Sequence, residues 1–128
     1  LVGGLMNILI GEDSHTIRKE LKDLLEKHGH RTLEAENGAE GIHLLENSKD
    51  EIELIISDLE MPVMDGMEFI QKCREIPKYE DTPCLIYTSN IKPDLRDRLK
   101  THGIQAILPK PLKENHMMKI VSSVRKKS

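Results

Sequence analysis

The 128-residue sequence has no tryptophan, one phenylalanine and two tyrosines, so a flavin site built on aromatic stacking has little support. No apolar run approaches the ~20 residues that a membrane helix needs. The opening residues LVGGLM lack the charged segment and long apolar stretch of a signal peptide. These absences predict a cytoplasmic protein that does not enter a membrane.

Neither sign of charge dominates, since 19 Lys and Arg stand against 22 Asp and Glu for a formal net charge of -3. Nucleic-acid binding requires a concentrated basic patch, and because the charges are balanced, no direct binding of nucleic acid is expected. The basic end Arg125–Lys127 is interpreted as a solvated helix terminus. Cys73 and Cys84 lie inside apolar patterns and are interpreted as buried free thiols, with a disulfide as the alternative.

Short apolar runs alternate with segments of helical periodicity along the chain. Strands are predicted at residues 6–10, 31–35, 54–57, 84–88 and 105–109. Helices are predicted at 15–28, 38–49, 66–76, 93–102 and around 117–124, with residues 77–83 as a loop. Ser14 and Asp65 are expected as N-caps, and Pro93 as a first-turn residue. The pattern predicts one α/β domain, a doubly wound five-stranded parallel sheet with five helices, over residues 6–127. Residues 1–5 are interpreted as a non-native remnant or a flexible start, with Met6 as a candidate natural start.

Several polar side chains directly follow predicted strands, where ligands bind in doubly wound sheets. Glu12 and Asp13 follow the first strand, and Asp58 follows the third. Unit charges ~4 Å apart repel by about 4 kcal/mol at an effective dielectric near 20. Oxygen ligands at a partly solvated rim suit Mg²⁺, which would relieve this repulsion. The alternative is that Glu12 and Asp13 only stabilise the start of the following helix through its dipole. This alternative has less support because Asp58 is expected beside them.

Thr88 and Lys110 follow the fourth and fifth strands and bring a hydroxyl and an ammonium to the same edge. Phosphoryl transfer depends on positioning and on neutralising charge at the phosphoryl oxygens. Asp58 is therefore the candidate nucleophile that forms an acyl phosphate, with Lys110 and Thr88 binding phosphoryl oxygens. A simple salt bridge between Lys110 and Asp58 is the alternative, and both interpretations can hold in the resting state.

Four motifs now carry a resemblance to a known family: IGEDS, SDLEMPVMDG, TPCLIYTSN and ILPKPL. In order and spacing they resemble those of the response-regulator receiver domain of two-component signalling, the CheY-like family, from about residue 7 to residue 125. The resemblance implies the strand order 2-1-3-4-5. It also implies that Asp58 takes its phosphoryl group from a sensor histidine kinase or a phosphotransfer protein. Self-phosphorylation from small donors and self-dephosphorylation would then be its only chemistry, so it would not be an enzyme in the usual sense.

The resemblance also assigns the metal site and the bond after the lysine. It implies that Mg²⁺ is held by Asp13, Asp58, the backbone carbonyl of Glu60, and Glu12 through water. The bond between Lys110 and Pro111 is expected to be cis. Glu60 and Asn90, two residues after the aspartate and the threonine, are expected to tune how fast water removes the phosphoryl group.

The sequence departs from the family at Ile107, because members usually carry Tyr or Phe three residues before the lysine. We expect phosphorylation still to draw Thr88 inward and to shift the face formed by residues 88–107. A downstream protein or an output domain is expected to bind the fourth helix, fifth strand and fifth helix. A homodimer is also possible.

Three competing hypotheses have less support. A nucleotide-binding protein needs a Gly-, Ser- or Thr-rich turn after the first strand, where Glu12 and Asp13 would repel phosphate. A Mg²⁺ phosphohydrolase of small molecules would need a cap segment, and none is evident. A constitutive interaction module that is never phosphorylated predicts the loss of at least one phosphorylation residue, and all are present.

Overall fold

The computed structural model describes residues 4–126, and within them five parallel strands form one sheet in the order β2-β1-β3-β4-β5. This confirms the predicted doubly wound sheet and its strand order. The strands are β1 (Asn7–Gly11), β2 (Arg31–Ala35), β3 (Leu54–Ser57), β4 (Cys84–Thr88) and β5 (Ile104–Pro109).

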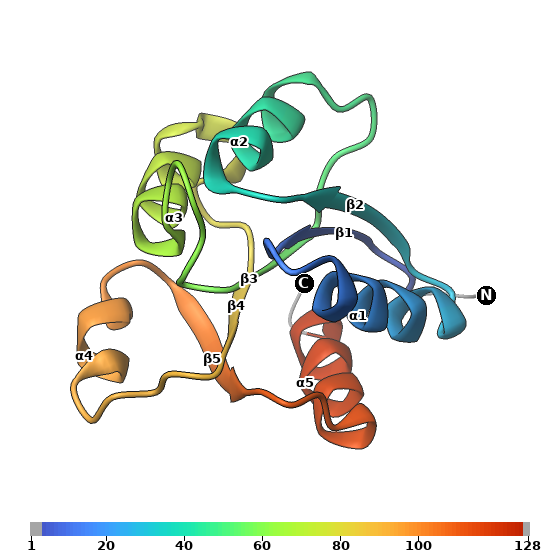
Figure 1. Ribbon diagram of the computed structural model, residues 1–128. Helices are drawn as coiled ribbons and strands as arrows, with labels where there is room; N and C mark the ends of the chain where they lie inside the picture. The colour runs from blue at the N-terminus through green and yellow to red at the C-terminus, as the bar shows by residue number, and fades with distance from the viewer. Residues whose placement is uncertain (1–3, 127–128) are drawn as a thin grey trace.

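Helices cover both faces of the sheet (Figure 1), as right-handed crossovers between parallel strands require. The α-helices within residues 4–126 are α1 (His15–Lys27), α2 (Gly38–Asn47), α3 (Gly66–Glu75), α4 (Leu95–Lys100) and α5 (Glu114–Lys126). In Figure 1, α1 and α5 lie on one face, whereas α2, α3 and α4 lie on the other.

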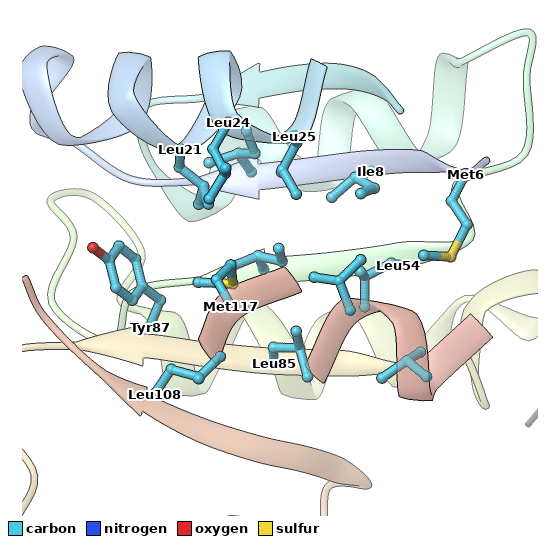
Figure 2. Close-up of a cluster of buried hydrophobic side chains, with 14 residues drawn as sticks. Met6, Ile8, Leu21, Leu24, Leu25, Leu54, Leu85, Tyr87, Leu108 and Met117 are labelled. Carbon is cyan, nitrogen blue, oxygen red and sulfur yellow. The ribbon is translucent and has the colours of Figure 1, made fainter. Parts of the chain in front are cut away.

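The sheet separates two hydrophobic cores. Leucines of α1 and residues such as Met117 of α5 pack on one face, against Ile8, Leu54 and Leu85 (Figure 2). Phe69 of α3 belongs to the core on the opposite face. Successive residues of β3 alternate between the two cores, so every position of this strand is buried. This is why its sequence reads as a continuous apolar run.

The predicted N-caps Ser14 and Asp65 are present at the starts of α1 and α3, which both begin near the carboxyl edge of the sheet. The Ser14 hydroxyl accepts a hydrogen bond from the Ile17 amide at 3.3 Å, and the Asp65 carboxylate accepts one from the Glu68 amide at 2.9 Å. Each cap satisfies a backbone donor that the helix itself cannot satisfy. The side chain of Asp65 is therefore used in starting α3, as predicted.

Several predicted boundaries are corrected by the structure, including the end of the second helix, which is Asn47 and not residue 49. The fourth helix begins at Leu95 and ends at Lys100, so Pro93 lies in the preceding turn and not in the helix. Only two buried leucines anchor α4, which explains why it is so short. The predicted loop at 77–83 contains a 3-10 helix, η1 (Pro77–Tyr79), whose buried Tyr79 hydroxyl accepts a hydrogen bond from the Ile52 amide.

Cys73 and Cys84 are buried free thiols, as predicted. Burial raises the pKa of both, that of Cys84 to about 12, which makes them unreactive. No helix within residues 4–126 is long and apolar enough to cross a membrane. Residues 1–3 and 127–128, and the side chains of Arg125 and Lys126, lie outside the part of the chain that the structure describes. The predictions of a non-native or flexible start at residues 1–5 and of a solvated helix end at Arg125–Lys127 concern mainly this outside part.

Candidate functional site

Three carboxylates meet at the carboxyl edge of the sheet. Strands β1 and β3 are neighbours with Gly11 opposite Ser57, which places the residues that follow them side by side. Carboxylate oxygens of Glu12, Asp13 and Asp58 all lie within 4.8 Å of one another. Glu12 is 3% exposed and Asp58 6% exposed, whereas Asp13 lies open to solvent. The cluster therefore has two buried members and one at the rim.

Lys110 contacts both buried carboxylates. Its Nζ donates to Glu12 Oε1 at 2.6 Å and to Asp58 Oδ2 at 2.7 Å, and its side chain is 11% exposed. Its backbone amide donates to the Thr88 carbonyl at 2.9 Å, which fixes the lysine against the end of β4. The peptide bond from Lys110 to Pro111 is cis. In the resting state, one ammonium is shared between two carboxylates.

The protonation equilibria follow from this sharing. Burial raises the pKa of Glu12, and the hydrogen bonds from Lys110 and the Ser14 amide offset that rise only in part. Burial lowers the pKa of Lys110, but its hydrogen bonds to Asp58 and Glu12 outweigh burial and leave that pKa above its usual value. Lys110 is therefore a permanent cation in the site.

Asp58 is held from both sides. Its Oδ1 accepts hydrogen bonds from the amides of Leu59 at 2.7 Å and Glu60 at 3.3 Å. Its own carbonyl accepts the Ser57 hydroxyl at 2.8 Å and lies against Gly66, the first residue of α3. The carboxylate is thus oriented before any ligand arrives.

The residues expected to sense or tune phosphorylation fall into two places. Thr88, Glu60 and Asn90 line one cavity of about 160 Å³, which is also lined by Leu59, the residue after Asp58. Thr88 is fully buried, and its hydroxyl lies 3.5 Å from the Asn90 amide that donates to it. Ile107 is half-buried opposite Ile86 and lines a different cavity, of about 210 Å³, between α4 and β5.

Two residues that shape the site were not predicted from the sequence. The Arg18 guanidinium, 8% exposed, donates to the Glu12 carbonyl at 2.8 Å and to Glu34 Oε1 at 3.0 Å. The Tyr87 ring centroid lies 5.6 Å from the Lys110 Nζ. The burial of Arg18 could have been predicted from the sequence. Arg18 precedes Leu21 by three positions and therefore lies on the buried side of the predicted helix. Charged residues are rarely placed there without a partner.

The donor set fits a hard divalent cation. Glu12, Asp13 and Asp58 offer only oxygen, and the exposed position of Asp13 leaves room for the retained waters that Mg²⁺ favours. Asp65 does not compete, because it caps α3. The group that the residues suit best is therefore Mg²⁺, at the rim beside Asp58.

Replacing Asp13 by asparagine should stabilise the metal-free protein by about 1 kcal/mol, because it removes the exposed member of a like-charged cluster in a water-like dielectric. Urea unfolding in the presence of a chelator measures the change. Asp23→Asn on α1, an exposed aspartate paired with Lys19, is the matched control and should give no gain. A clear loss of stability in Asp13→Asn would contradict the repulsion.

Known proteins resemble this chain in sequence and in fold. A family model described as the response regulator receiver domain matches residues 8–122. A chemotaxis protein CheY homolog of Campylobacter jejuni is 34% identical over 115 residues, which are 85% of this chain and 88% of that protein. The structure of CheY4 of Vibrio cholerae superposes with a TM-score of 0.87 at 30% identity, over 94% of this chain and 98% of that one.

A third neighbour carries a metal. The response regulator TrrA from Thermotoga maritima, determined in complex with Mg(2+)-BeF, has a TM-score of 0.79 and 25% identity over 94% of this chain and 99% of that one. The matched range extends from β1 into α5 and contains the residues of the acidic cluster, together with Thr88 and Lys110. The chain therefore belongs to the response regulator receiver domain family of two-component signalling.

Proposed function

We propose that this chain is a phosphoacceptor in a two-component phosphorelay, with Asp58 as the residue that is phosphorylated. The donor would be the phosphohistidine of a sensor histidine kinase or of a phosphotransfer protein. One observation carries the proposal: the Lys110 ammonium lies within hydrogen-bond distance of two buried carboxylates, at a rim where a third carboxylate faces solvent. A structural salt bridge would need only one of them.

In the proposed step, a carboxylate oxygen of Asp58 attacks phosphorus, an oxygen–phosphorus bond forms, and the phosphorus–nitrogen bond to the donor histidine breaks. The departing imidazole takes a proton from solvent. The Leu59 and Glu60 amides orient the Asp58 carboxylate, while Lys110 and Thr88 bind phosphoryl oxygens. Asp13, Asp58, the Glu60 carbonyl and, through water, Glu12 would hold Mg²⁺, which would supply positive charge to neutralise the phosphoryl oxygens.

Intact mass spectrometry after incubation with Mg²⁺ and acetyl phosphate tests the proposal. The expected result is the addition of one phosphoryl group, which is lost in Asp58→Asn and in the presence of a chelator. Asp81→Asn, an exposed aspartate near the opposite end of β4, is the control and should be phosphorylated normally. An unaltered mass of the folded, unsubstituted protein would contradict phosphorylation and would favour a constitutive interaction module.

We expect the phosphorylated state to move the segment of residues 88–107. Drawing Thr88 toward the phosphoryl group provides the difference in interaction energy that two states require, and the Asn90 amide follows through its hydrogen bond to Thr88. The six residues of α4 offer little resistance. Amide chemical shifts measured on beryllofluoride addition should change through residues 90–107. Changes confined to the Asp58 pocket would contradict the movement of this segment.

The remaining assignments follow from the same proposal. A downstream protein or an output domain would bind the face formed by α4, β5 and α5, which adjoins the moving segment, and a homodimer through this face is also compatible. A cytoplasmic location and a receiver domain over residues 6–127 complete the proposal.

A further inference from the structure

Arg18 is a buried cation that the proposed phosphotransfer chemistry does not use. It is the fourth residue of α1, and its side chain is 8% exposed. A buried guanidinium is expensive unless its donors are satisfied. What satisfies them therefore indicates what the residue does.

The partners of Arg18 lie in the β1–α1 loop, at the end of β2 and in the first turn of α1. Nη1 donates to the Glu12 backbone carbonyl at 2.8 Å, and Nε donates to Glu34 Oε1 at 3.0 Å, at the end of β2. Nη2 lies 3.7 Å from Glu36 Oε1 and 3.4 Å from His15 Nδ1. The planar guanidinium thus ties the peptide between Glu12 and Asp13 to the neighbouring strand.

That peptide determines where two members of the acidic cluster lie. The Glu12 amide donates to the Ala35 carbonyl at 3.0 Å, and the Glu12 carboxylate accepts the Ser14 amide at 2.9 Å and Lys110 at 2.6 Å. Arg18 holds the remaining backbone group, the carbonyl, and with it the plane from which the Asp13 side chain departs. Asp13, exposed at the rim, relies on this peptide for its position.

We propose that Arg18 is a positioning residue for the metal site, which acts by fixing the peptide between Glu12 and Asp13 so that the Asp13 carboxylate faces Asp58. The inference rests on the proposed function, because it assumes that the cluster binds Mg²⁺. Groups that orient metal ligands typically contribute 10- to 100-fold to metal affinity.

Two other roles for Arg18 predict different results. A positive charge that acted only through its field would repel Mg²⁺, so its removal would tighten binding. A residue that only stabilised the fold would change the melting temperature and leave Mg²⁺ affinity unaltered. Positioning alone predicts weaker binding when the guanidinium is replaced at constant charge.

Calorimetric titration of the full chain with Mg²⁺ alone separates the three roles. Arg18→Lys keeps the charge but loses the fork that reaches both the Glu12 carbonyl and Glu34, and we expect roughly 10-fold weaker binding. Arg18→Met should weaken binding at least as much, despite the loss of a repelling charge. Arg96→Met, an exposed arginine just inside α4, is the control and should bind as the parent does.

Affinity equal to or tighter than that of the parent in a folded Arg18→Lys protein would overturn the inference and leave the proposed function standing. Absence of Mg²⁺ uptake by the unsubstituted protein would overturn the proposed function itself. If Arg18→Met does not fold, Arg18→Lys decides alone, because it compares two cations of equal charge. The amide resonances of Asp13 and Ser14 should also shift in Arg18→Lys and stay in place in Arg96→Met.

Discussion

Replacing Lys110 by methionine should lower the free energy of unfolding of the metal-free protein by roughly 3–5 kcal/mol, the usual cost of removing one partner from a buried ion pair. Glu12 and Asp58, 3% and 6% exposed, would lose the ammonium that they share. Methionine fills a similar volume, so lost packing contributes little. Urea unfolding near neutral pH with a chelator present measures the loss.

The loss should shrink as the pH falls. Burial already raises the pKa of Glu12, and Lys110 is the main group that opposes this rise, so the pKa of Glu12 increases further in the variant. The folded variant then binds a proton at a pH where the unfolded chain does not. Stability therefore increases as pH falls through this raised pKa toward the unfolded value of 4.5. Unfolding measured at about pH 5 should show a smaller difference from the parent than at about pH 7.5.

The same substitution should slow phosphorylation by acetyl phosphate on the order of 10²-fold, because it removes the cation that we propose binds the phosphoryl oxygens. Lys113→Met is the matched control, since Lys113 is exposed on the same segment. It should leave stability and phosphorylation unchanged. A Lys110→Met protein with parental stability at both pH values would show that the two carboxylates are solvated more fully than their burial indicates.

Strand ends were the part of the site that the sequence predicted well. The nearly all-apolar sequence of β3 indicates helices on both faces of the sheet, and parallel strands covered in this way share one carboxyl edge. Once the strands were placed, Glu12 and Asp58 had to lie together. The residue types then predicted a cation site, because the repulsion between neighbouring carboxylates is relieved by a bound cation.

Contacts that depend on side-chain reach could not be predicted in this way. Periodicity indicates which face of an element a residue occupies, not what it meets there. The contact of Lys110 with Glu12, 98 residues apart, depends on how far the lysine extends across β3 and β4. The role of Arg18 depends in the same way on the distance from α1 to the end of β2.

The ends of a helix with few buried residues, such as α4, also could not be predicted from the sequence. Proline at 93 permits a helix to start there but does not require one. The start of α4 is determined instead by burial of Leu95 and Leu99, and the preceding residues adopt a turn. The caps of α1 and α3 were predictable because a side-chain oxygen directly satisfies a backbone amide.

Replacing Gly66 by alanine should be the most disruptive small substitution at the site. A Cβ at this position would lie 2.1 Å from the Asp58 carbonyl oxygen and 2.6 Å from the Leu59 Cα. Both atoms belong to the backbone, so no rotamer change relieves the overlap. The Gly66 amide also donates to the Leu59 carbonyl at 2.8 Å, which prevents the start of α3 from moving alone. We expect a loss of roughly 3 kcal/mol in the free energy of unfolding, at the upper end for overpacking.

Phosphorylation should fall together with stability, because the overlap is relieved only by displacing the backbone of Asp58, the proposed phosphoacceptor, or the first turn of α3. Moving Asp58 would lengthen its hydrogen bonds to the Leu59 amide and to Lys110, so a folded Gly66→Ala protein should react slowly with acetyl phosphate. Urea unfolding and the rate of phosphorylation measure the two effects.

Gly103→Ala separates a general glycine effect from this specific overlap. Gly103 lies between α4 and β5 with a φ of +71°, and a Cβ there meets only the flexible Arg74 side chain, at 3.3 Å. Its replacement should cost about 1–2 kcal/mol through backbone strain and leave the phosphorylation rate unchanged. If Gly66→Ala instead behaved like Gly103→Ala in both measurements, the β3–α3 connection would be loose enough to absorb a methyl group. The orientation of Asp58 could then not depend on the packing of α3 against its carbonyl, and would depend on the Leu59 and Glu60 amides and on Lys110 alone.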